Sequence, residues 1–130
     1  MDTRSEEYLS ACRAALASEQ ARSLAETRQW AHVDKQKVHG DWDLLYRKLT
    51  PLMQGHPASS PTIQAVMAEH YEIVSRFFQP SRQAYIGMSL FYGENPDMKA
   101  FHDSYHPGMV SFLAQAMAIY AHEHLPSCEP

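Results

Sequence analysis

The stretch SPTIQAVMAEHYEIVSRFF, residues 60–78, indicates most clearly how this chain folds. Ser60 has the side chain of a good helix cap, because its oxygen can accept an otherwise unpaired backbone N–H group. Pro61 suits the first helical position, where its missing N–H would have no partner. The apolar residues that follow recur at helical spacing: Ile63, Val66, Met67, Ile73, Val74, Phe77 and Phe78. We predict a helix over residues 61–78.

The rest of the chain repeats this arrangement. Pro80, Pro96 and Pro107 each precede a segment with helical periodicity, and Asn95 is a good cap before the second of them. The predicted helices cover residues 6–25, 33–53, 61–78, 80–92, 96–104 and 107–124, with a loop at 54–60. Because no segment shows the alternation of a strand, we predict an all-α fold with about five to six helices.

Length and composition limit the classes of protein. The 130 residues suffice for one domain, and the net charge of −4 without a basic run argues against direct nucleic-acid binding by this chain. The N-terminus lacks the apolar core of a signal peptide, and the longest apolar stretch, 112–121, is too short to cross a bilayer. Cys12 and Cys128 form no metal or disulfide motif. We expect a cytoplasmic chain with two free thiols and no membrane contact.

The first helical segment differs from the others. Its apolar side, with Leu9, Cys12 and Leu16, is sparse, and the sequence turns polar beyond it. Since helices in proteins depend mostly on packing, we expect it to be the least stably docked element. We therefore divide the chain into an N-terminal helical segment at 1–26, mobile without ligand, and a ligand-binding domain at 27–130.

The histidines are the first candidates for chemistry. His102 and His106 stand four apart, as two metal ligands on one helix face would, but Pro107 makes His106 a helix-boundary residue, so we expect no metal site. His70 lies in the apolar arc of its helix and is either a core histidine or a polar group facing a cavity. The chain has no G-x-S-x-G, phosphate-binding glycine loop or H-E-x-x-H. We expect neither catalytic residues nor a cofactor.

Aromatic residues and methionines are abundant and cluster between residues 77 and 105. Most should be core, but tyrosines favour places where the hydroxyl meets a polar partner, and Tyr85, Tyr92 and Tyr105 suggest a groove with an apolar floor and polar edges. Such a groove suits hydrophobic small molecules. The candidate ligand-binding residues are Trp42, Tyr46, His70, Phe77, Tyr85, Gly87, Met88, Phe91, Tyr105 and Met109. Gly87 would let a ligand approach the backbone closely.

Several stretches carry a family resemblance. They are RKLTPLM at 47–53, GHP at 55–57, AEH at 68–70, FFQP at 77–80, MSLFY at 88–92 and PGM at 107–109. In this order and spacing, the chain from Thr27 onward resembles the TipAS domain, the drug-recognition domain of some MerR-family transcriptional regulators. The resemblance implies a single globin-like helical domain without haem, which binds bulky hydrophobic antibiotics such as thiopeptides between its helices.

The resemblance also implies how such a domain acts. In the family it serves as the effector domain of a regulator or sequesters the drug as a stand-alone protein, and DNA is contacted only through an attached helix-turn-helix domain. The family's prototype captures its thiopeptide with a cysteine, and Gly87 stands at that position here, so we expect reversible binding. Two alternatives remain open from the residues: a haem-binding sensor with His70 as iron ligand, and a module that docks a helix of another protein.

Overall fold

The computed structural model describes residues 5–127, and within them every regular element is an α-helix. The six helices are α1 (Glu6–Glu26), α2 (Lys35–Leu52), α3 (Pro61–Val74), α4 (Arg82–Glu94), α5 (Pro96–Asp103) and α6 (Met109–His124). The prediction of an all-α fold is therefore confirmed. None of the helices in this part of the chain combines the length and the apolar character needed to span a membrane. Cys128 lies outside the described residues.

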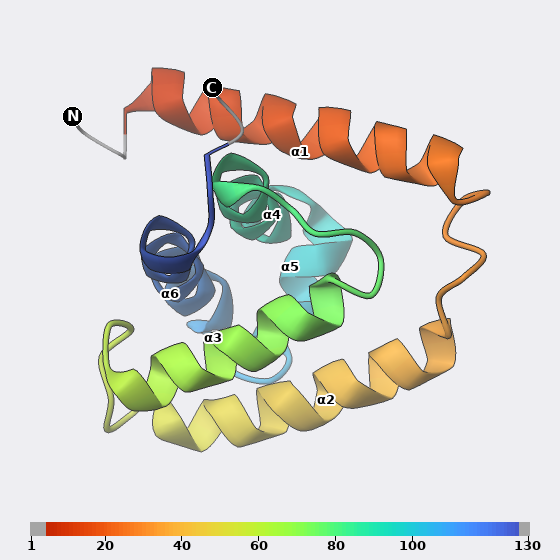
Figure 1. Cartoon of the computed structure of the whole chain (residues 1–130). Helices are drawn as coiled ribbons and strands as arrows, with labels where there is room; N and C mark the ends of the chain where they lie inside the picture. The colour runs from red at the N-terminus through yellow and green to blue at the C-terminus, as the bar shows by residue number, and fades with distance from the viewer. Residues whose placement is uncertain (1–4, 128–130) are drawn as a thin grey trace.

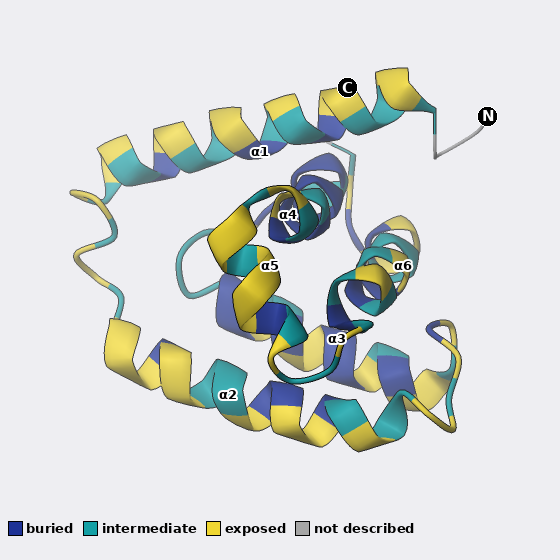
Figure 2. Cartoon of the chain, turned by 180° about the vertical axis from the view of Figure 1, so that it is seen from behind, coloured by how far each residue is buried: buried dark blue, intermediate teal, exposed yellow. Residues whose placement is uncertain are grey.

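The helices form three layers around α4. Figure 1 shows α1 along one side, α2 and α3 paired on the opposite side, and α4, α5 and α6 between them. The central helix has eight buried residues among its thirteen, whereas α1 has three among twenty-one. Seen from behind, α1 turns an exposed outer surface to solvent, while α4 is buried over most of its length (Figure 2). A helix that is apolar on most sides belongs inside a helical domain, as α4 does.

Two of the proline-led helices begin as predicted. The Ser60 hydroxyl accepts from the Ile63 N–H at 3.2 Å at the start of α3, and Asn95 Oδ1 accepts from the Met98 N–H at 3.0 Å at the start of α5. Pro61 and Pro96 are the first residues of these helices. A short polar cap followed by proline thus locates a helix start reliably.

The starts of α4 and α6, and the end of α3, differ from the prediction. Helix α4 begins at Arg82 rather than at Pro80, because the Ser81 hydroxyl accepts from a backbone N–H of its first turn and is a better cap than Gln79. Helix α6 begins after Gly108 rather than at Pro107. Helix α3 ends at Val74, four residues early, so that residues 75–77 form turns instead of a last helical turn.

Helix α1 is held on α4 at three points. Near the middle of α4, the Cys12 backbone passes so close to Gly87 that a Cβ on the glycine would clash with the Cys12 carbonyl oxygen. On either side, Arg13 pairs with Glu94 at 2.7 Å, and Glu19 accepts from the Ser81 N–H at 2.9 Å. The two helices therefore run antiparallel, in a register fixed by one short contact and two polar ones.

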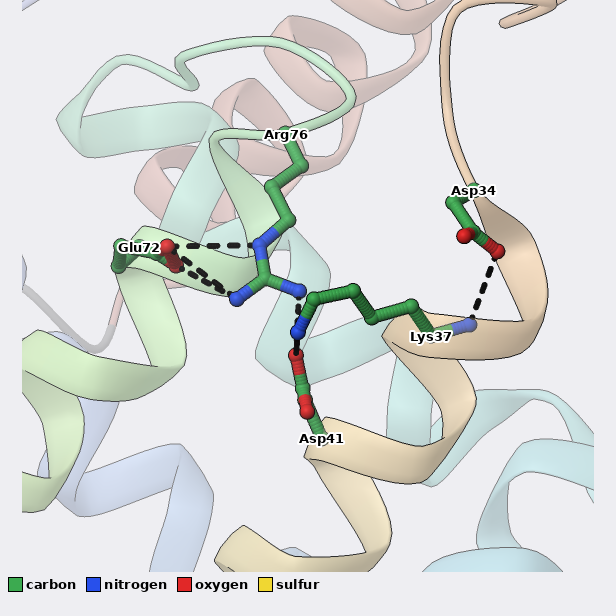
Figure 3. A network of polar contacts seen from close by, with 5 residues as sticks. All are labelled: Asp34, Lys37, Asp41, Glu72 and Arg76. Carbon is green, nitrogen blue, oxygen red and sulfur yellow. Dashed lines mark hydrogen bonds and ion pairs between the residues drawn. The ribbon is translucent and has the colours of Figure 1, made fainter.

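A polar network joins α2 to the residues after α3. Figure 3 shows Arg76 between Asp41, at 2.6 Å, and Glu72, at 3.2 Å, while Lys37 reaches Asp41 at 2.9 Å. Hydrogen bonds from Lys37 and Arg76 keep the pKa of the Asp41 carboxyl below its ordinary value. The network fixes the chain at residue 76, immediately before two phenylalanines that turn inward.

The contact at Gly87 yields a first prediction. In Gly87→Ala the new methyl group would collide with a backbone carbonyl that cannot rotate away, so α1 must shift. We expect a loss of about 1–3 kcal/mol in the free energy of unfolding, measured by urea denaturation, with faster hydrogen exchange in α1. Gly40→Ala is the matched control, because a Cβ at Gly40 in α2 meets nothing within 4 Å and should stabilise by about 0.5–1 kcal/mol. Equal effects of the two changes would contradict the packing of α1 on α4.

Candidate functional site

A cavity of about 380 Å³ lies between α1 on one side and α2, α4 and α5 on the other. Its volume falls in the range of small-molecule sites, about 300–1,000 Å³. Most of its wall is apolar or aromatic. The lining residues are Leu16, Gln20, Trp30, His39, Trp42, Tyr46, Val74, Phe77, Phe78, Met88, Phe91, Tyr92, Asp97, Met98, Phe101 and His102. Apolar walls with a few polar groups are typical of sites for hydrophobic ligands.

Half of the candidate ligand-binding residues line this cavity. They are Trp42, Tyr46, Phe77, Met88 and Phe91, from α2, the 75–81 connection and α4. The Trp42 and Phe77 rings stack at 6.0 Å with an 11° angle between their planes. Segments far apart in the sequence thus form one continuous aromatic surface. The role of these residues in binding stays a prediction.

The other five candidates lie elsewhere. His70 and Tyr85 are fully buried beneath the cavity floor, and Met109 is fully buried on α6. The space above Gly87 is filled by α1 and not by a ligand. Tyr105 donates from its hydroxyl to Asp43 at 2.7 Å and faces a different part of the surface. Helical periodicity placed residues such as His70 and Met109 on apolar faces, but it could not tell which neighbouring helix would cover such a face.

The cavity floor is a hydrogen-bonded array of buried aromatic residues. His102 Nδ1 lies 2.7 Å from the Met98 carbonyl oxygen, which can only accept, so this nitrogen carries the proton. His102 Nε2 therefore accepts, and its partner is the Tyr46 hydroxyl at 2.9 Å. The Tyr92 ring stacks on His102 at 4.1 Å between centroids. These polar groups already have partners, so the floor presents mainly ring surface to the cavity.

His70 lies one step deeper and joins three helices. Its Nδ1 is 2.8 Å from the Tyr85 hydroxyl, and its Nε2 is 3.3 Å from Tyr46 Oη and 3.4 Å from Tyr92 Oη. Burial, with a smaller effect from His102, lowers the pKa of His70 to about 3, so the ring is neutral at pH 7. Both nitrogens are engaged by tyrosines, so this arrangement supports the core-histidine alternative and offers no free nitrogen to a haem iron.

Trp30 is a wall residue that the sequence analysis missed. It follows Arg28 and Gln29, and all three have left-handed backbone conformations, with φ of 53°, 60° and 63°. The turn brings Trp30 Nε1 to 2.8 Å from the Ser23 hydroxyl and its ring edge-on to Phe77, at 4.9 Å between centroids. Without glycine or asparagine in the segment, the sequence carries no signal for such a turn.

The α5 side of the wall was missed for another reason. Asp97, Met98 and Phe101 line the cavity from α5, and none of them was among the candidate ligand-binding residues. Phe101 is in fact 41% exposed. Because α5 has only eight residues, its spacing alone could not separate a core-facing side from a cavity-facing side.

Comparisons with known proteins fit this geometry. The profile of the TipAS antibiotic-recognition domain matches residues 7–120. The chain belongs to this family. A 72-residue stretch is also 31% identical to the HTH-type transcriptional regulator SkgA of Caulobacter vibrioides, in each of two strains, and covers 54% of this chain and 28% of the regulator. No solved structure matches.

These findings indicate a regulatory, non-enzymatic type of domain. The family match begins at residue 7, so it includes most of α1, which the quoted sequence stretches did not cover. The chain spans less than a third of the length of the regulators it matches. The TipAS match and the relatives together support an effector-binding domain of the kind attached to helix-turn-helix proteins.

The buried imidazoles make the stability of this TipAS domain depend on pH. The folded pKa of His70 is about 3 and the unfolded value about 6.5, so between these values the unfolded chain binds a proton that the folded chain does not. Stability should fall as the pH drops below about 6.5, by up to about 1.4 kcal/mol per pH unit from this residue. Urea denaturation from pH 7.5 to 5.0 measures the slope, which His70→Gln should reduce. His56→Gln, in the loop after α2, controls for the loss of an imidazole as such. An unchanged slope in His70→Gln would contradict a buried neutral His70.

The left-handed turn before Trp30 gives a third prediction. A side chain in this conformation costs about 1–2 kcal/mol, and glycine avoids that cost. Gln29→Gly, at an exposed position, should therefore stabilise the domain by up to about 1 kcal/mol in thermal or urea unfolding. Gln36→Gly, at an exposed position in the first turn of α2, should instead destabilise it by about 1 kcal/mol. Equal losses at both positions would argue against the left-handed turn.

Proposed function

We propose that this chain binds a compact, largely apolar drug in the cavity and senses it by reversible binding without chemistry. The observation that carries the proposal is the cavity itself, about 380 Å³ in volume and walled by aromatic residues, in a chain of the antibiotic-recognition family. The driving force would be the removal of apolar area from water, about 25 cal/mol per Å² before the costs of association.

The size of the cavity favours certain ligands. A molecule with two to four fused or linked rings fits this volume, whereas a thiopeptide macrocycle is far larger and would leave part of itself outside. Complete enclosure of a larger ligand would need α1 to move, because Leu16 and Gln20 form one wall. The expectation that the segment 1–26 orders around a ligand belongs to this proposal.

Two modes of action follow from the same binding step. The relatives are helix-turn-helix regulators of which the chain spans 28%, and this favours an effector-sensing domain of a MerR-type regulator. In that role DNA would be contacted only by an attached helix-turn-helix domain. Sequestration of the drug by the domain alone is the second mode, and it requires the same cavity and a tighter affinity.

Binding can be tested by tryptophan fluorescence, since Trp30 and Trp42 both line the cavity. Titration with a panel of polycyclic and peptide antibiotics should give a saturable change for at least one member. Phe91→Ala should weaken that binding about tenfold, because Phe91 lines the cavity and is 42% exposed, so the fold should tolerate the change. Leu44→Ala, at a 66% exposed position outside the cavity, is the matched control and should leave the affinity unchanged. A panel that produces no saturable change would reject the proposed function.

A further inference from the structure

Several aromatic rings line the cavity and give it a particular electrostatic character. Trp30 and Phe78 are stacked at 6.3 Å with a 7° interplanar angle, and Trp42 stacks on Phe77. Phe101 and Phe91 complete the side formed by α4 and α5. The face of an aromatic ring is electron-rich, so a ring with a face open to the cavity attracts a cation, most strongly where tryptophan contributes.

The charged groups around the cavity also favour a positively charged ligand. Among the described residues, Asp97 is the carboxylate that lines the cavity, and no lysine or arginine does so. The neighbouring Lys99 is paired with Asp103 at 2.5 Å, and Arg76 is held by Asp41 and Glu72. Within residues 5–127 the Asp97 carboxylate has no ion-pair partner. The rim therefore holds a carboxylate, in the first turn of α5, that no cationic side chain of the described residues pairs with.

The polar groups of the cavity floor are poorly suited to discriminate between ligands, because they already have partners. The Tyr46 hydroxyl and both nitrogens of His102 are already hydrogen-bonded to one another or to the Met98 carbonyl. A ligand that hydrogen-bonded to these groups would have to break an existing bond, with little net gain. The aromatic rings and the charge at the rim can then select among apolar molecules of one shape.

Given the proposed function, we infer that the cavity selects lipophilic monocations, such as ammonium or phosphonium ions with aromatic or alkyl substituents, over neutral or anionic molecules of the same shape. The cation would lie against the Trp30, Trp42 and Phe77 wall, and Asp97 would neutralise its charge at the rim. The rings supply both apolar contact and attraction for the charge, while the carboxylate adds an interaction that salt weakens.

Two ions of nearly equal shape and opposite charge provide the test. Isothermal titration calorimetry would compare tetraphenylphosphonium with tetraphenylborate, and the dye Nile red would serve as a neutral probe. We expect tetraphenylphosphonium to bind at least about tenfold more tightly than tetraphenylborate. Its affinity should also fall as the salt concentration rises.

Substitutions test which residues cause the preference for cations. Asp97→Asn should weaken tetraphenylphosphonium about three- to fivefold and leave Nile red unchanged. Glu123→Gln removes the same charge from α6, away from the cavity, and should have no effect on either probe. Phe91→Leu, which keeps apolar volume but removes a ring face, should weaken the cation more than the neutral dye.

The outcomes separate this inference from the proposed function. Binding of Nile red with equal affinities for the two ions, or with tetraphenylborate the tighter, would overturn the preference for cations and leave a drug-binding cavity. An unchanged tetraphenylphosphonium affinity in Asp97→Asn would overturn the role of Asp97. Failure of all three probes and of the antibiotic panel would reject the proposed function and this inference with it.

Discussion

The buried hydrogen bonds that connect His70, Tyr46 and His102 are the constraint on which the arrangement of helices depends. A buried imidazole or phenol that lacks a partner costs about 1–3 kcal/mol, so each of these groups must find one inside the protein. The partners come from α2, α3, α4 and α5, and they meet only when these four helices take one relative arrangement. The network thus sets the positions of the helices that carry most of the cavity wall.

Helix α1 depends on different contacts. Its apolar contribution is small, with Cys12 and Leu16 as the buried apolar residues, and the short approach at Gly87 supplies its closest packing on α4. The fold therefore combines a four-helix unit tied by buried polar bonds with an outer helix that packs closely on α4 and forms polar contacts with Glu94 and Ser81. Leu16 and Gln20 belong to this outer helix, so one wall of the cavity comes from outside the hydrogen-bonded unit.

The sequence predicted the helices well because their signals are local. Ser60 with Pro61 and Asn95 with Pro96 mark helix starts through groups within three residues, and these starts are confirmed. The start at Pro80 was wrong because a better cap, Ser81, stands one residue further along. Competition between adjacent caps is decided by side-chain reach and geometry, which a proline rule alone does not include.

The cavity was harder to predict because its wall is assembled from distant segments. Trp42 and Phe77 were identified because they lie on the apolar faces of predicted helices. The same reasoning chose Met109 in α6, which is buried in the core. Periodicity shows that a face is covered, but only tertiary packing shows whether a helix or an open space covers it. Trp30 lies in a left-handed turn that has no sequence signature. The proposed role of Asp97 rests on its lack of an ion-pair partner, and that lack depends on the folded surroundings.

The polar floor and the aromatic wall have opposite consequences for recognition. Hydrogen bonds that are satisfied within the protein make the floor rigid and leave it with few free donors or acceptors, so it does not demand a particular polar pattern from a ligand. Ring faces are tolerant of shape and respond mainly to apolar area and charge. A cavity built in this way would accept ligands that differ in their functional groups, and it would distinguish them by volume and by the sign of their charge. That combination would suit the proposed sensing of several related drugs better than a site for one metabolite.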